Sequence, residues 1–234
     1  MLMIIHRLAY NLSGFLLDRQ DTDYGPMLLT SADLTIPYVS IFVLPYAGTW
    51  LLGLAVIAYA IVFRTGNYKI FRGIYAAVLF TTLLEFLIWL LIPASISLRV
   101  DMQVLQAGGV FDQWLAAIYG SATPWNVFPS AHVGFAAMIW LYSKHLALPQ
   151  HQIWFLLCCV SICLSVLFVR NHYLLDIPAG LAVTYIGYRF VFLPCIKGGV
   201  LDRLSSRIVI LAVGTICCVT ILGTLLVMGD SWSL

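Results

Sequence analysis

A short polar stretch, VRNHYLLDIPAG at residues 169–180, places Arg170, His172 and Asp176 within seven positions of a chain in which only 9% of residues are charged. An imidazole can act as a nucleophile or as a general acid–base group, and a nearby carboxylate can fix its tautomer. Residues four apart on a helix advance about 6 Å along its axis, so the side chains of His172 and Asp176 can meet. These residue types predict nucleophilic or acid–base chemistry on an anionic group.

A second stretch, PWNVFPSAHVGFAA at residues 124–137, adds another imidazole. Its second proline suits the first turn of a helix, so Ser130, His132 and the backbone N–H near Ala131 are expected at a helix N-terminus. Unpaired N–H groups at such a terminus bind anions. Asn126, which precedes them, is a candidate substrate contact.

A third stretch, LIPASISLRVD at residues 91–101, follows an apolar run in which Pro93 ends the predicted helix, and it carries Arg99. Glu85 lies about two turns inside that helix. A buried carboxyl is costly unless it is paired or protonated. A neutral Glu85 bonded to a neighbouring helix is the favoured interpretation, and a substrate contact is the alternative.

Each stretch also has a simpler explanation. Arg99 can extend to lipid headgroups, and His132 can hydrogen-bond to a neighbouring helix at a membrane interface. His172 and Asp176 can form a local helix pair worth a few tenths of a kcal/mol. Only convergence of the three stretches on one site would favour chemistry.

The elements that must bring them together follow from composition. With 62% hydrophobic residues among 234, the chain has more apolar surface than a water-soluble domain of this size can bury. Runs long enough to cross about 30 Å of hydrocarbon indicate spanning helices. The predicted spans lie near residues 41–63, 72–93, 127–143, 152–169, 173–195 and 207–228. The predicted fold class is an all-α integral membrane protein with a six-transmembrane-helix bundle over residues 38–234.

The distribution of basic residues predicts the orientation. Lys and Arg concentrate at one set of span ends, which the positive-inside rule places in the cytoplasm. The three polar stretches then share the other side, and both chain termini lie there too. Residues 1–37 are predicted to be an interfacial segment, because His6 and Arg7 interrupt its apolar run. From their position, these residues and the loop 96–126 are expected to cover the site.

Other classes of partner are not indicated. All six cysteines fall inside or at the ends of predicted spans, without the spacing of a zinc site or a disulfide framework. No basic patch suggests nucleic acid. No metal or cofactor is expected, because two arginines can neutralise a phosphate and no carboxylate cluster lies on this side.

Together, two imidazoles, a carboxylate, two guanidinium groups and a helix N-terminus suit phosphate transfer. The segments FPSAHV and NHYLLDIPAG resemble the second and third signature motifs of the type 2 phosphatidic acid phosphatase superfamily, which comprises membrane phosphatases and lipid phosphotransferases. The resemblance covers residues 33–195 in layout. It is carried by Arg99, residues 126–133 and residues 170–180.

The chain departs from that pattern in two places. It lacks the usual first motif, a lysine followed after six residues by Arg-Pro, of which Arg99 looks like a remnant. The third motif usually has an arginine six residues before its histidine, whereas here Arg170 stands two before His172. This arrangement, with a tyrosine after the histidine, resembles the branch that contains inositol phosphorylceramide synthase.

The resemblance implies a role for each matching residue. His172 would be the nucleophile, Asp176 would orient it, and His132 would protonate the leaving alcohol and later activate the acceptor. Four groups would stabilise the phosphoryl oxygens: Arg99, Arg170, Ser130 and the N–H near Ala131.

The leading expectation is a metal-independent lipid phosphatase acting on a phospholipid or polyprenyl phosphate. A lipid phosphotransferase is the alternative, and a non-catalytic lipid-binding or transport protein is a third. Small size and the resemblance favour a bacterial plasma membrane, with the site on its non-cytoplasmic face.

Overall fold

The computed structural model describes residues 2–18, 22–49, 51, 68–146 and 152–197. Within these ranges every regular element is a helix, so the predicted all-α class is confirmed. The predicted span 207–228 and most of the predicted span 41–63 lie outside the described residues.

The other four predicted apolar runs are helices, and their ends agree with the prediction to within a few residues. They are α5 (Tyr68–Leu91), α8 (Ala131–Leu146), α9 (Gln152–Phe168) and a continuous helix over Asp176–Lys197. The last comprises α10 (Asp176–Gly187), the π-helical turn η3 (Tyr188–Phe192) and α11 (Leu193–Lys197). The run predicted from residue 173 becomes helical at Asp176, so His172 lies in the turn that precedes the helix.

In the described ranges, Lys69–Leu91 and Asp176–Lys197 are long and apolar enough to cross a membrane. Two further apolar helices, Ser40–Thr49 and Gln152–Phe168, are shorter. These lengths are consistent with a membrane protein, whereas the bundle of six spans stays a prediction.

The helices pack around α8, which contacts both α9 and α10, while α5 contacts α10 and η3. The crossing of α8 and α10 depends on Gly180. A Cβ atom at this position would lie 2.6 Å from the Ser130 carbonyl oxygen, so any larger residue would push the helices apart. This close approach brings the starts of both helices together. The second polar stretch lies at the start of α8, and the first polar stretch lies at the start of α10.

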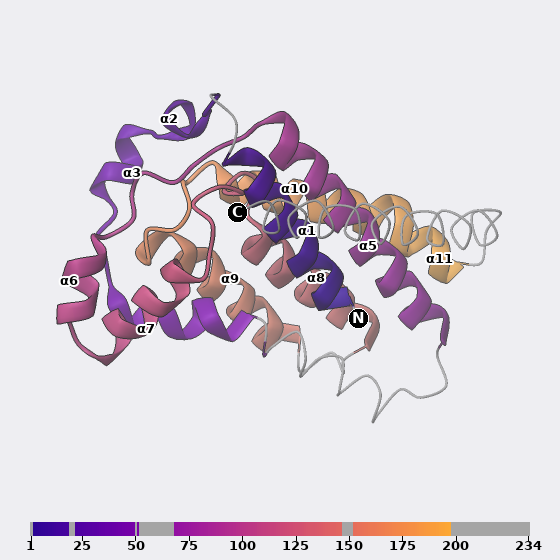
Figure 1. Ribbon diagram of the computed structural model, residues 1–234. Coiled ribbons are helices and arrows are strands. Elements are labelled where there is room, and N and C mark those ends of the chain that lie inside the picture. Colours follow the sequence, from indigo (N-terminus) through magenta and orange to yellow (C-terminus); the bar gives the residue numbers. More distant parts are fainter. Residues whose placement is uncertain (1, 19–21, 50, 52–67, 147–151, 198–234) are drawn as a thin grey trace.

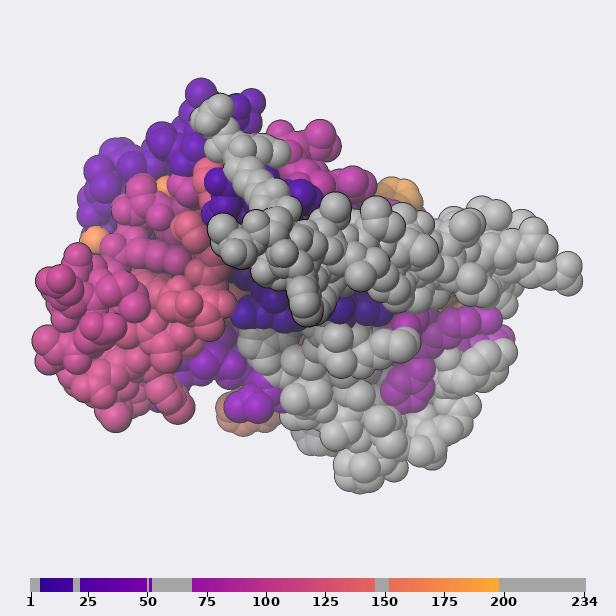
Figure 2. Space-filling view, in the orientation of Figure 1, coloured from indigo at the N-terminus to yellow at the C-terminus, as the bar shows by residue number. Residues whose placement is uncertain are grey.

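Shorter elements cover that end of the bundle (Figure 1). They are α2 (Gly25–Leu28), α3 (Ser31–Thr35), η1 (Ser40–Phe42), α6 (Met102–Ala107) and α7 (Val110–Gly120). The space-filling view shows α6 and α7 forming the left-hand end of the molecule (Figure 2).

The N-terminal helix α1 (Leu2–Leu17) lies against α5. One face is buried, including the side chains of Ile5, His6, Ser13 and Leu17. The predicted helix is therefore present, and its interfacial position in a membrane stays a prediction.

Candidate active site

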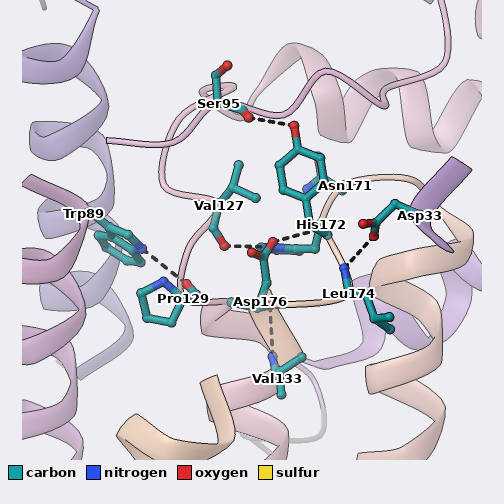
Figure 3. A network of polar contacts seen from close by, with 12 residues as sticks. Asp33, Trp89, Ser95, Val127, Pro129, Val133, Asn171, His172, Leu174 and Asp176 are labelled. Carbon is teal, nitrogen blue, oxygen red and sulfur yellow. Dashed lines mark hydrogen bonds and ion pairs between the residues drawn. The ribbon is translucent and has the colours of Figure 1, made fainter. Parts of the chain in front are cut away.

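The centre of the site is His172, whose ring is held by two oxygen atoms (Figure 3). Its Nδ1 lies 3.0 Å from Asp176 Oδ2 and 3.0 Å from the Val127 carbonyl oxygen. Asp176 Oδ2 also accepts the Tyr173 backbone N–H at 2.8 Å. Because the carbonyl oxygen can only accept, Nδ1 carries the proton and Nε2 keeps its lone pair. This is the tautomer of an imidazole ready to act as a nucleophile.

The spacing suggested that His172 and Asp176 meet along a helix. In the structure they meet across a turn instead. Asp176 is the first residue of α10, and its backbone N–H donates to the Tyr173 carbonyl oxygen at 3.1 Å. The carboxylate is fully buried, whereas the imidazole is 5% exposed. The turn therefore fixes the carboxylate behind the ring and leaves the opposite ring edge accessible.

His132, the second residue of α8, faces His172. Their ring centroids are 6.0 Å apart in an edge-on arrangement. The ring of His132 stacks on Tyr46, with centroids 4.1 Å apart and planes inclined by 20°. The two histidines, forty residues apart in the chain, therefore flank one space.

Arg99 approaches the same space through Asn171. Its Nε donates to Asn171 Oδ1 at 2.8 Å, and Asn171 Nδ2 donates to the Tyr46 hydroxyl at 2.5 Å. The guanidinium also lies 4.7 Å from the centre of the Tyr119 ring. Burial raises the pKa of Tyr119 to about 12, against the opposing effect of Arg99, so this hydroxyl stays protonated.

These side chains border a cavity of about 230 Å³. Of the residues predicted for the site, His132, His172, Arg99, Ala131 and Asn126 line it. The remaining lining residues are His6, Arg7, Tyr10, Tyr46, Ala47, Ile118, Ser121, Ala122, Thr123, Trp125, Val127 and Asn171. Asp176 acts from behind His172.

Arg170 and Ser130 do not line the cavity. Arg170 donates through Nη2 to the Ile36 carbonyl oxygen at 3.1 Å, which directs it toward the N-terminal segment. Its backbone has φ of 52°, a left-handed conformation that turns the chain between α9 and His172. Ser130 is buried, and its Oγ accepts the Val133 N–H at 3.4 Å. Both residues shape the loops that carry the histidines.

Glu85 also lies outside the lining. It is 1% exposed, and its Oε2 is 3.7 Å from His6 Nδ1, a distance too long for a hydrogen bond. Burial, with a smaller contribution from Arg7, lowers the pKa of His6 to about 3, so this imidazole is neutral at pH 7. Glu85 therefore lies against α1.

The sequence interpretation missed several lining residues. His6 and Arg7 had a visible signal, since they interrupt an apolar run, but they were read as marks of an interfacial helix. Asn171 lies between two residues that were chosen, and its amide links Arg99 to Tyr46. Nothing in the local sequence distinguishes Tyr46 from other aromatic residues of an apolar run.

The segment between α1 and η1 fastens the site loops. Asp33 Oδ1 accepts the Leu174 N–H at 2.6 Å (Figure 3), and Asp23 Oδ1 accepts the Ser95 N–H at 2.8 Å. Burial acts to raise the pKa of Asp23, but hydrogen bonds from the Ser95 hydroxyl and from the Ser95 and Gly25 N–H groups outweigh it and lower this pKa. These contacts tie the third and the first polar stretches to the same segment.

In the part of the chain that the structure describes, no three His, Cys, Asp or Glu side chains gather as metal ligands would. Two imidazoles, one oriented by a buried carboxylate, and a guanidinium instead share a cavity, and such groups suit phosphoryl transfer. The fold and the site together define an all-helical protein whose cavity carries groups suited to phosphoryl transfer.

Comparison with protein families identifies the particular family. A model of the PAP2 superfamily matches residues 30–190, well over half of the chain. The chain therefore belongs to the PAP2 superfamily, and the resemblance to the type 2 phosphatidic acid phosphatases is confirmed. Membership indicates activity of the phosphatase or phosphotransferase type. Comparisons with curated proteins and with solved structures gave no match.

Proposed function

We propose that the protein is a membrane phosphatase that hydrolyses a lipid phosphate monoester or pyrophosphate through a phosphohistidine at His172. The observation that carries this proposal is the placement of His172. Its Nδ1 is 3.0 Å from Asp176, and its ring centroid is 6.0 Å from that of His132 across one cavity. Membership of the PAP2 superfamily supports the same class of reaction.

In the first step, the lone pair of His172 Nε2 attacks phosphorus, and the bond from phosphorus to the leaving oxygen breaks. His132, in its protonated form, gives its proton to that oxygen, so the lipid leaves as an alcohol or, from a pyrophosphate, as a monophosphate. Asp176 stabilises the positive charge that develops on the His172 ring. Arg99 stabilises the phosphoryl oxygens.

In the second step, His132, now neutral, takes a proton from water, and the hydroxide attacks phosphorus. The bond between phosphorus and Nε2 breaks, its electron pair returns to His172, and inorganic phosphate leaves. His132 ends the cycle protonated, as it began. No metal ion is required, because the charge of the phosphoryl group is met by Arg99 and by the N–H groups at the start of α8, near Ala131.

Exposed apolar side chains support a membrane location. On α9, Ile153, Trp154, Leu157, Val160 and Leu164 are all between 43% and 64% exposed. They recur at helical spacing along one face, as expected of a surface that meets lipid.

The helix directions support an active site on the non-cytoplasmic side. Lys69 lies in the first turn of α5, Lys144 lies in the last turn of α8 and Lys197 ends α11. All three therefore lie at the helix ends opposite the histidines. Basic residues mark the cytoplasmic side. We propose the plasma membrane of a bacterium, with the site at its outer face.

A lipid phosphotransferase is the second candidate. It would use the same attack by His172 on the phosphorus of a lipid, and the hydroxyl of a second lipid would replace water in the second step, so that a phospho-headgroup moves to the second lipid. The order Arg170–Asn171–His172–Tyr173, which resembles the branch containing inositol phosphorylceramide synthase, favours this candidate.

One experiment separates the candidates. Purified protein in detergent is incubated with a synthetic phosphatidate or polyprenyl phosphate, with and without a lipid alcohol, and inorganic phosphate and new phospholipid are measured. A phosphatase releases phosphate in both reactions, whereas a phosphotransferase forms the new phospholipid only with the alcohol. Stoichiometric binding without turnover would instead indicate a lipid-binding or transport protein.

A trapping experiment tests the intermediate. Substrate labelled with ³²P should leave acid-labile, base-stable label on the wild-type protein and none on His172→Ala. Full turnover by His172→Ala would disprove the phosphohistidine mechanism, and loss of activity in EDTA would disprove its independence of metal.

A further inference from the structure

The helix α1 is part of the cavity wall although it lies outside the PAP2 match, which begins at residue 30. Three of its residues, His6, Arg7 and Tyr10, line the same cavity as the two histidines of the candidate site. They lie within slightly more than one helical turn, so one face of α1 supplies them together. The role of this face in the active site rests on the proposed function.

Side chains of the second polar stretch hold α1 in place. Asn126 Nδ2 donates to the Tyr10 carbonyl oxygen at 2.8 Å, and Trp125 Nε1 donates to Asp18 Oδ1 at 2.5 Å. A Cβ atom at Gly14 would lie 2.8 Å from Thr123 Cγ2, so only glycine permits this approach. The chain therefore places α1 at a defined position beside the residues that precede His132.

The same turn holds two guanidinium groups. Arg7 Nη2 donates to the Ser121 carbonyl oxygen at 2.8 Å. Arg99 Nη1 donates to the Ala122 carbonyl oxygen at 3.4 Å, and its Nη2 to that of Thr123 at 3.1 Å. Three consecutive carbonyl groups thus hold two arginines that are 92 positions apart in the chain, and they hold them on the wall of one cavity.

Neither guanidinium forms an ion pair with a carboxylate of the described residues. Both act on one neighbour: burial raises the pKa of Tyr10, while Arg99 and Arg7 act to lower it. Two close positive charges repel each other, and an anion between them removes that repulsion. Guanidinium groups match the oxygens of a phosphate in pairs of parallel hydrogen bonds.

We propose that Arg7 and Arg99 form one anion site that binds the phosphate group of the substrate, and that α1 is thereby an integral part of the active site. Arg7 fills the role that the sequence motif suggested for Arg170, which donates to Ile36 and lies outside the cavity lining. The chemistry recognised is a phosphate group, in a lipid phosphate or as free inorganic phosphate.

The test measures both sources of phosphate on the full chain in detergent. Arg7→Gln keeps a donor for the Ser121 carbonyl oxygen but removes the charge, and Arg7→Lys keeps the charge but loses the paired hydrogen bonds. For Arg7→Gln, KM for a lipid phosphate and the inhibition constant of inorganic phosphate should each rise roughly tenfold, as for loss of one charge-assisted hydrogen bond. Arg7→Lys should show a smaller rise in both, and kcat should change less than KM.

The exposed Arg189, in η3 away from the cavity, is the matched control. Arg189→Ala removes the same charge and should leave both constants unchanged. An unchanged inhibition constant for phosphate in Arg7→Gln would overturn the proposal, even if KM rose, because Arg7 would then bind another part of the lipid.

Folding and function are controlled separately. The melting temperature measured without phosphate shows whether Arg7→Gln is folded. If Arg7→Gln is not folded, Arg7→Lys is the decisive variant. The proposal would be overturned if the inhibition constant of phosphate were the same in the wild type, in Arg7→Lys and in Arg189→Ala. Turnover by His172→Ala would overturn the proposed function, whereas phosphate inhibition that does not depend on Arg7 would overturn only the site.

Discussion

The described residues contain two histidine–carboxylate pairs, and they differ in every respect that matters for catalysis. His172 and Asp176 are 3.0 Å apart, and the Tyr173 N–H and the Val127 carbonyl oxygen fix both groups further. His6 and Glu85 are 3.7 Å apart, which is too far for a hydrogen bond between the two side chains. Only the first pair has the geometry that fixes a tautomer.

A buried carboxylate beside an imidazole is therefore not enough to identify a catalytic pair. Asp176 is four residues from its histidine and belongs to the same turn, so local backbone geometry sets their distance. Glu85 and His6 come from α5 and α1, and packing between those helices sets theirs. In the proposed mechanism the first pair orients a reacting group, whereas the second pair is a contact between α1 and α5.

The largest effect should follow from His172→Ala. Removal of a nucleophile held in this way should lower kcat by roughly 10⁴-fold, the scale seen when one member of a catalytic histidine system is lost. Release of inorganic phosphate from a lipid phosphate measures it. His145→Ala is the control, because His145 bonds Tyr188 at 2.9 Å near the far end of α8. Equal losses in both variants would contradict the assignment.

The second effect compares the two carboxylates directly. Asp176→Asn should lower kcat by roughly 10²- to 10⁴-fold, because an amide can donate to Nδ1 and stabilise the wrong tautomer. Glu85→Gln should lower it by less than about tenfold, because that side chain lies outside the cavity lining. Steady-state kinetics of both proteins test this order. A loss in Glu85→Gln as large as in Asp176→Asn would make the second pair catalytic.

A third effect concerns the helix crossing beneath the first pair. Gly180→Ala places a Cβ atom 2.6 Å from the Ser130 carbonyl oxygen, and overpacking of this kind costs about 1–3 kcal/mol. The melting temperature in detergent should fall, and kcat should fall with it, because the starts of α8 and α10 separate. Gly120→Ala is the control, since a Cβ atom there meets nothing within 4 Å. Equal melting temperatures for the two variants would show that the crossing tolerates a methyl group.

The sequence predicted the first pair and missed the second for a physical reason. Hydropathy located the long helices, and motif spacing found His132, His172 and Asp176, because local geometry relates each to its own helix start. The role of Arg170 could not be read in this way. Its side chain direction depends on a left-handed φ of 52°, which the spacing does not reveal.

The contribution of α1 to the cavity is a long-range feature, and its one local signal, the pair His6 and Arg7 within an apolar run, does not specify it. Arg7 meets Ser121 across 114 positions, and Asn126 meets Tyr10 across 116. Such contacts depend on how the whole bundle packs, which neither periodicity nor composition specifies. An apolar run with two polar residues therefore favoured an interfacial helix. Its position in the chain suggested that it covers the site, but only the fold shows which of its residues line the cavity.

The smallest effect concerns a third carboxylate, Asp23. It joins chain segments as Glu85 does, but it is fixed by hydrogen bonds as Asp176 is. Since those bonds lower the pKa of Asp23 in the folded protein, its contribution to stability is full above the unfolded value of about 3.9 and is lost as pH falls through the folded value. Asp23→Asn should therefore melt a few degrees below the wild type at pH 6, and the difference should shrink as the pH falls below about 3.9. Asp101→Asn is the control for loss of one exposed negative charge, because asparagine also caps a helix. A difference between Asp23→Asn and wild type that stayed constant from pH 6 to pH 3 would show that Asp23 joins these segments through packing and not through its charge.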